Sequence, residues 1–278
     1  MKFAICNELF EGWEFARTVE CVAQVGYQGI ELAPFTFADS VVDISRAERR
    51  EIRKTAEAAG LQIVGLHWLL TKPEGLHLMH PDKAVREKTV DYLLRLVEFC
   101  ADVGGTVMTF GSPNQRTILP GVSRETALTL AVEGLQICGE TARSHGVMIC
   151  LEALPPAQTN FLNTNAEVRA LVRAVDHPNV QMMIDVKSMY VEDMPIPDNI
   201  HACQGLFHHV HANDANQRWP GSGDVDFRPI FRALQDVGYD GYVSVEVFDF
   251  AAPPETIALE ALRYMSQCLT EIRSSPAV

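Results

Sequence analysis

A chain of 278 residues, of which 47% are hydrophobic, can bury a sizeable core as one large domain or two small ones. Its formal net charge of −13 argues against a nucleic-acid partner, because phosphate binding needs clustered lysine and arginine. The seven cysteines are odd in number and form no CxxC pair, which favours a reducing compartment over a disulfide scaffold.

The N-terminal segment lacks the pattern of a secretory signal peptide. It reaches an acidic residue, Glu8, before any apolar stretch of the required length. No apolar run elsewhere approaches the ~20 residues of a membrane-spanning helix. We therefore expect a cytoplasmic protein with no membrane partner.

Strand and helix signals alternate along the chain. Apolar, β-prone segments predict strands at 2–8, 30–34, 62–68, 106–112, 147–154, 180–188, 206–214 and 242–249. Helical spacing of apolar residues, together with capping residues, predicts helices at 13–25, 45–59, 84–103, 123–144, 164–175, 198–203, 227–237 and 255–273. The segment 112–121 is predicted to be a polar loop.

A short repeat supports a rotationally repetitive fold. Gly-Tyr-Xxx-Gly precedes a predicted strand at 26–29 and again at 238–241. The alternation of strands and helices predicts a parallel sheet, and eight repeats favour closure into a single (β/α)8 TIM barrel of the α/β class. Without a linker or a shift in composition, we expect one domain over 1–278, with 274–278 as a loose tail.

Four consecutive predicted strands carry a metal-ligating side chain near their ends. These residues are Glu152, Asp185, His211 and Glu246. At the two-residue period of a strand, each shares a face with the residues that point into the barrel, and the C-terminal strand ends of a barrel converge. Three carboxylates and one imidazole predict a divalent-metal site that suits Mn²⁺, Mg²⁺ or Co²⁺, with Zn²⁺ as an alternative.

Other polar residues in these segments have plainer interpretations. A histidine within an apolar strand is ordinarily packed or hydrogen-bonded in the core, and we interpret His208 and His209 in this way. Glu31 is interpreted as a structural residue or one that supports a ligand. His67 and Arg116 are candidate substrate contacts at the same barrel end, although a surface position explains Arg116 equally well.

The chain resembles the xylose-isomerase-like TIM-barrel superfamily, and most closely its ketose 3-epimerase and hydroxypyruvate isomerase branches. The resemblance covers nearly the whole chain. It rests on the segments 26–32, 151–152, 184–185, 209–211, 218–223, 238–241 and 245–246.

This resemblance implies a mechanism. Glu152, Asp185, His211 and Glu246 would hold one divalent metal, with Mn²⁺ as the first candidate, and the metal would chelate neighbouring oxygens of a ketose. Glu152 and Glu246 would act as the acid/base pair on opposite faces of the substrate, through a cis-enediolate. Arg218 matches a family arginine that contacts substrate hydroxyls.

The substrate pocket departs from the family pattern. Ser188 occupies the position of a substrate-contacting histidine, and Gln158 that of a substrate-contacting glutamate. Lys187, which has inward-facing parity, is predicted to make some of these substrate contacts or to bind a carboxylate or phosphate. The expected partner is a small sugar. Barrels of this type often form dimers or tetramers, but the sequence has no interface signature.

Three alternatives stay open on the sequence. The first is a dehydratase or lyase on a keto-polyol, as in the inosose and 3-dehydroshikimate dehydratase branches, because it begins with the same carbon-acid chemistry. The second is an endonuclease-IV-like DNA repair enzyme, which the acidic charge opposes. The third, a non-catalytic sugar-binding protein, would not need two carboxylates around one point.

Overall fold

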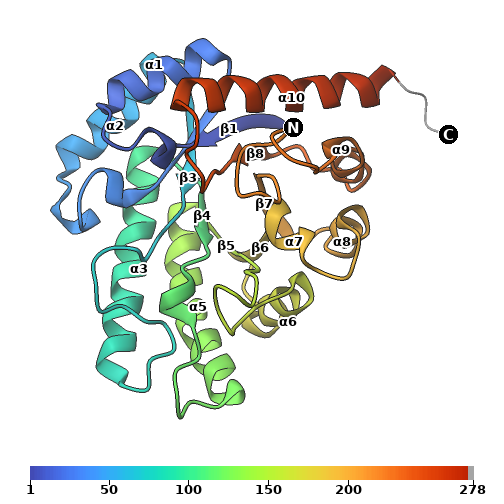
Figure 1. Ribbon diagram of the computed structural model, residues 1–278. Helices are drawn as coiled ribbons and strands as arrows, with labels where there is room; N and C mark the ends of the chain where they lie inside the picture. Colours follow the sequence, from blue (N-terminus) through green and yellow to red (C-terminus); the bar gives the residue numbers. More distant parts are fainter. Residues whose placement is uncertain (275–278) are drawn as a thin grey trace.

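The computed structural model describes residues 1–274 and has eight parallel strands that form a closed barrel (Figure 1). The strands are β1 (Lys2–Cys6), β2 (Gly29–Leu32), β3 (Gln62–Leu66), β4 (Val107–Phe110), β5 (Met148–Leu151), β6 (Val180–Asp185), β7 (Phe207–Ala212) and β8 (Tyr242–Val245). Phe3 of β1 lies opposite Val243 of β8, and this pairing closes the ring. The predicted (β/α)8 TIM barrel is confirmed.

Helices follow the strands and form the outer layer (Figure 1). They are α1 (Phe15–Val25), α2 (Arg46–Ala58), α3 (Lys83–Val103), α4 (Pro113–Arg116), α5 (Arg124–His145), α6 (Asn165–Val175), α7 (Val186–Tyr190), α8 (Ile196–Ala202), α9 (Phe227–Asp236) and α10 (Pro254–Ser274). Three 3-10 turns lie at η1 (Asn7–Phe10), η2 (Pro34–Thr36) and η3 (Val41–Asp43). Among the helices of residues 1–274, none has the length and apolar character needed to cross a membrane.

Capping residues set several helix boundaries. Ser45 begins α2 through a capping box, in which its side chain accepts from the backbone of Glu48 while the Glu48 side chain accepts from the backbone of Ser45. Gly26 and Gly104 end α1 and α3 with φ of 110° and 90°, a left-handed conformation that glycine adopts without steric cost. These local signals explain why the predicted helices and the observed ones agree closely.

The strands end earlier than the sequence predicts. The strand expected at 180–188 ends at Asp185, because the Asp185 carboxylate accepts a hydrogen bond from the backbone of Ser188 and caps α7. The loop expected at 112–121 contains α4. Ser274, expected in the tail, is the last residue of α10, and 275–278 lie outside the described residues.

The barrel interior changes from apolar to polar toward the C-terminal strand ends. Val107, Cys150 and Met183 form a small buried cluster inside the barrel, separate from the main core between strands and helices. Glu152 and Asp185 each follow a member of this cluster by two residues and therefore share its inward parity. The fold thus carries these two carboxylates to the end of the barrel where neighbouring strands finish.

Candidate active site

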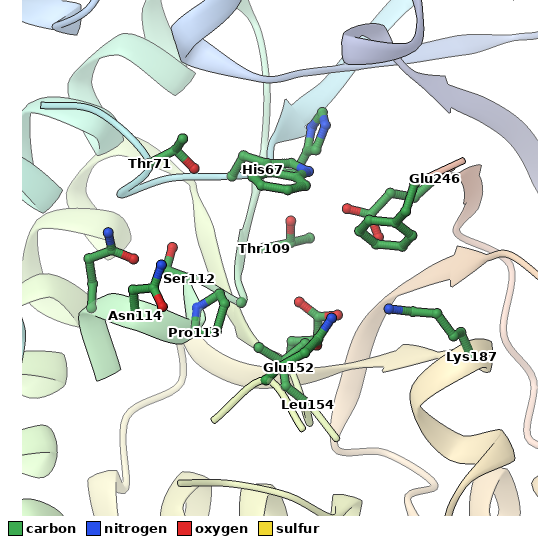
Figure 2. Close-up of a pocket in the computed structure, with 15 residues that line it drawn as sticks. His67, Thr71, Thr109, Ser112, Pro113, Asn114, Glu152, Leu154, Lys187 and Glu246 are labelled. Atoms are coloured by element: carbon green, nitrogen blue, oxygen red, sulfur yellow. The ribbon is translucent and has the colours of Figure 1, made fainter. Parts of the chain in front are cut away.

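A cavity of about 220 Å³ lies at the C-terminal ends of the strands (Figure 2). Glu152 and Glu246, the predicted acid/base pair, face it from different sides in Figure 2. Its walls are formed by His67, Trp68, Thr71, Thr109, Gly111, Ser112, Pro113, Asn114, Gln115, Glu152, Leu154, Gln158, Lys187, Glu246 and Phe248. Both predicted catalytic residues therefore face the same cavity.

Three of the four predicted metal ligands lie together. Asp185, His211 and Glu246 each offer a ligand atom, and these atoms lie within 4.8 Å of one another. Nδ1 of His211 is 3.1 Å from Oε2 of Glu246. Within residues 1–274, Glu152 belongs to no such group, although it lies close enough for Asp185 and Glu246 to affect its pKa.

Backbone and amide donors hold Asp185 in place. Its Oδ1 accepts from the backbone nitrogen of Ser188 at 2.7 Å, and its Oδ2 accepts from Nδ2 of Asn213 at 2.7 Å. The Asn213 side chain also accepts from the backbone nitrogen of Lys187 at 2.8 Å. Asn213 therefore links the end of β7 to both the carboxylate and the first turn of α7.

Glu31 on β2 is a buried centre of the hydrogen-bond network. Its Oε2 is 2.7 Å from Nε2 of His209, its Oε1 is 3.2 Å from Nε2 of His211, and Oγ1 of Thr109 donates to Oε1. Burial alone would raise the pKa of Glu31, but the two histidines hold it well below its ordinary value. These contacts agree with the supporting role assigned to Glu31 and confirm His209 as a hydrogen-bonded core residue. His208 has the opposite strand parity and is exposed, so its predicted core position is wrong.

The protein groups push the pKa values of the two glutamates apart. Burial, with repulsion from Asp185 and Glu246, raises the pKa of Glu152 to about 8. Burial would also raise the pKa of Glu246, but contact with His211 lowers it below its ordinary value. A carboxylic acid and a carboxylate that line one cavity are equipped to give and to take a proton at neutral pH.

The donor set fits a divalent cation. Asp185, Glu246 and His211 are buried, and the pKa of Glu152 is raised first by burial and then by repulsion from the carboxylates of Asp185 and Glu246. Oxygen-rich sites with one imidazole suit hard or borderline divalent ions. A cation bound here would relieve the repulsion among the three carboxylates.

The predicted substrate contacts divide into two groups. His67, Gln158 and Lys187 line the cavity. Ser188 lies on α7 outside the cavity wall, and its backbone nitrogen donates to Oδ1 of Asp185. Arg218 also lies outside the cavity wall, and its Nε donates to Oδ2 of Asp249 at 2.8 Å.

Two further residues near the site have roles that sequence reasoning missed. Glu8, in the 3-10 turn after β1, is paired with Nε2 of His67, and its position at the end of the predicted strand 2–8 was the available signal. Arg116 is fully buried, and its Nη1 donates to the carbonyl oxygen of Glu152 at 2.6 Å. Burial lowers the pKa of Arg116 to about 10. The surface interpretation of Arg116 is therefore wrong.

Comparison with known proteins places this geometry in a family. The family model described as a xylose isomerase-like TIM barrel matches residues 19–268. D-psicose 3-epimerase of Agrobacterium fabrum is 30% identical over 241 residues, which cover 84% of this chain and 80% of that protein. L-ribulose 3-epimerase of Mesorhizobium japonicum is 27% identical over 246 residues, which cover 88% and 79%.

A solved structure agrees with this assignment. The crystal structure of D-psicose 3-epimerase in the presence of D-fructose superposes with a TM-score of 0.85 at 25% identity, and covers 97% of this chain and 99% of that one. The relatives named here are epimerases, so the predicted isomerase or epimerase class is confirmed and the dehydratase alternative is not favoured. The chain belongs to the xylose isomerase-like TIM-barrel family.

Proposed function

We propose that this protein is a divalent-metal-dependent epimerase of a ketose or keto-sugar derivative, with Glu152 and Glu246 as its acid/base pair. One observation carries the proposal: both glutamates line the same cavity and face it from different sides (Figure 2). The names of the relatives supply the substrate class, since D-psicose and L-ribulose are both ketoses.

The proton transfers follow from the two glutamates. In one direction Glu246, the carboxylate, removes the proton from the carbon beside the ketose carbonyl. The C–H electron pair forms the C=C bond, and the carbonyl π electrons move onto the oxygen. Glu152, the carboxylic acid, then returns a proton to that carbon from the opposite face, which inverts its configuration. In the reverse direction the two residues exchange roles, as reversibility requires.

A metal ion would be held by Asp185, His211 and Glu246, with Glu152 as the fourth proposed ligand. When bound, a divalent ion supplies Lewis-acid chemistry that makes the C–H bond beside a carbonyl more acidic. We propose Mn²⁺ first, then Mg²⁺, Co²⁺ or Zn²⁺, because three of the four donors are carboxylates. Metal analysis after dialysis against equal concentrations of the four ions ranks them.

The remaining proposals concern the substrate contacts and the setting of the enzyme. His67, Gln158 and Lys187 are proposed as substrate contacts because they line the cavity, and Ser188 and Arg218 because of their positions in the family pattern.

The seven cysteines are all unpaired, which supports a cytoplasmic location. A homodimer or homotetramer is also proposed, and sedimentation of the metal-loaded protein measures it.

Proton exchange tests the proposed reaction. The Mn²⁺-loaded protein is incubated in D₂O with D-psicose, L-ribulose and other ketoses, the metal is removed with a chelator, and the sugars are examined by proton NMR. We expect deuterium at the carbon beside the carbonyl together with the epimeric sugar, both dependent on metal. Deuterium with loss of water would replace the epimerase by a dehydratase. Absence of exchange on every ketose, with metal bound, would refute the proposed function.

A further inference from the structure

The ammonium group of Lys187 points into the cavity (Figure 2). Lys187 follows Asp185 by two residues, lies in the first turn of α7 and is 8% exposed. Its backbone nitrogen donates to Asn213, which also donates to Asp185. The same amide therefore positions the lysine and a predicted metal ligand.

The ammonium has no acceptor among residues 1–274. No ion pair or hydrogen bond within this part of the chain involves Nζ, although Glu152 and Glu246 line the same cavity. Nζ lies 4.0 Å from the centroid of the Phe248 ring, and the face of this ring attracts a cation. A nine-tenths buried lysine that contacts an aromatic face and the cavity has its hydrogen-bond donors free for a ligand.

The charges in the cavity indicate which group of the bound sugar the Lys187 ammonium contacts. With Glu152 protonated as the acid of the pair, Asp185 and Glu246 carry two negative charges, which one divalent ion offsets. The buried ammonium of Lys187 is then left without a balancing negative charge while the bound sugar is neutral. During proton removal one additional negative charge develops on the sugar. A preorganised donor in a buried site stabilises such a charge most strongly where it develops.

We propose that Lys187 is a catalytic residue that donates a hydrogen bond to the sugar oxygen on which negative charge develops. The inference rests on the proposed epimerase function. The C–H bond breaks, its proton passes to a glutamate, and its electron pair forms the C=C bond while the carbonyl π electrons move onto oxygen. Lys187 keeps its proton and shares it with that oxygen, so the residue is unchanged after each turnover.

The test compares Lys187→Met and Lys187→Arg with wild type and with a matched control, Lys83→Met. Lys83 is an exposed lysine whose side chain is 77% accessible. Kinetics use the ketose that wild type epimerises fastest. Calorimetry measures binding of glycolohydroxamate, a small planar mimic of an enediolate, to the Mg²⁺-loaded proteins. Mg²⁺ affinity is measured in parallel to show that the metal site is intact.

For Lys187→Met we expect kcat to fall by 10²–10³-fold, the typical cost of losing one donor to a developing oxyanion, with KM changed less than threefold. Glycolohydroxamate affinity should fall at least tenfold. Lys187→Arg should recover part of both losses, and Lys83→Met should match wild type.

Two results would overturn the assignment. Equal glycolohydroxamate affinity in wild type and Lys187→Met, at equal Mg²⁺ affinity, removes the proposed contact whatever the kinetics show. A raised KM with unchanged kcat makes Lys187 a ground-state binding residue, for example for an acidic group on the sugar. If wild type epimerises no ketose, the proposed function fails, but hydroxamate binding still decides the role of Lys187.

Discussion

Oε1 of Glu31 on β2 lies 3.2 Å from Nε2 of His211 on β7, so the buried carboxylate of Glu31 orients the imidazole ring of His211. The other ring nitrogen, Nδ1, faces Glu246. A carboxylate that binds the second nitrogen of a metal-ligating histidine fixes its tautomer and orientation. Glu31 therefore supports the proposed metal centre without lining the cavity.

Glu31→Gln should weaken metal binding by about 10–100-fold, because the neutral amide no longer holds the imidazole of His211 as strongly. Competition with a chelating dye measures the affinity. Glu192→Gln, a glutamate of the α7–α8 connection outside the cavity wall, is the matched control. Unchanged metal affinity in Glu31→Gln would show that His211 is not a ligand or needs no support.

Glu246→Gln should keep the fold and lower kcat by at least ~10²-fold, because the amide cannot accept the substrate proton. Metal affinity should fall too, since Glu246 lies in the group with Asp185 and His211. Circular dichroism checks the fold, steady-state kinetics measure kcat, and metal titration measures the metal affinity. Full activity in this variant would remove Glu246 from both proposed roles.

Gly111→Ala should reduce activity with little loss of stability. A Cβ atom at Gly111 would lie 2.3 Å from Oε2 of Glu152, and the end of that flexible side chain can move away. A displacement of about 1 Å at a reacting group can cost about 10²-fold in rate. Thermal unfolding and kcat are measured together. An active variant would mean that Glu152 does not react from the observed position.

Arg218→Gln separates a structural role from substrate binding. The pair between Arg218 and Asp249 is exposed, with side-chain accessibilities of 41% and 43%, so its loss should cost less than about 1 kcal/mol of stability. If Arg218 turns toward the sugar, KM should rise about tenfold, equivalent to about 1.4 kcal/mol. An unchanged KM would leave Arg218 as a partner of Asp249 alone.

His77 should make the stability of the enzyme dependent on pH. Its Nε2 contacts the Thr117 carbonyl oxygen at 2.9 Å, and its Nδ1 accepts from the backbone of Met79 at 3.2 Å. Burial lowers the pKa of His77 below its ordinary 6.5, so the folded protein binds fewer protons there than the unfolded chain. This stabilisation is fully present above pH 6.5 and is lost as the pH falls toward the folded-state pKa.

Chemical denaturation of wild type and His77→Gln between pH 7.5 and 5 measures this effect. The difference in the free energy of unfolding should shrink as the pH falls. A difference that stays constant over this range would show that protonation of His77 does not affect folding. The measurement uses metal-free protein for both variants, so that metal binding does not add its own pH dependence.

The barrel and the placement of the ligand strands could be predicted because periodicity of two residues is a local signal. Parity alone placed Asp185 and His211 on the inward face, and both lie in the same group in the structure. The position of Ser188 could not be predicted, because the side chain of Asp185 starts a helix where β-prone residues continue. A hydrogen bond between a side chain and the backbone overrode strand propensity there.

Side-chain contacts between distant segments also could not be predicted from the sequence. Glu8 and His67 are separated by 59 positions, and they meet because β1 and β3 both pair with β2 in the curved sheet of the barrel. Arg116 was expected in a polar loop, yet it is fully buried against the Glu152 carbonyl. A hydrophilic residue in a loop-like segment has no local pattern that distinguishes a buried contact from a solvated one.

The two contacts of the His211 ring also constrain how this centre can evolve or be redesigned. Exchange of His211 for cysteine, to favour a softer metal, would leave Glu31 with a buried charge and one fewer partner. A buried carboxylate that loses one of its partners is costly even though His209 and Thr109 remain, so a second change at Glu31 should accompany the first. Natural or laboratory selection for a new metal preference should therefore change β2 and β7 together.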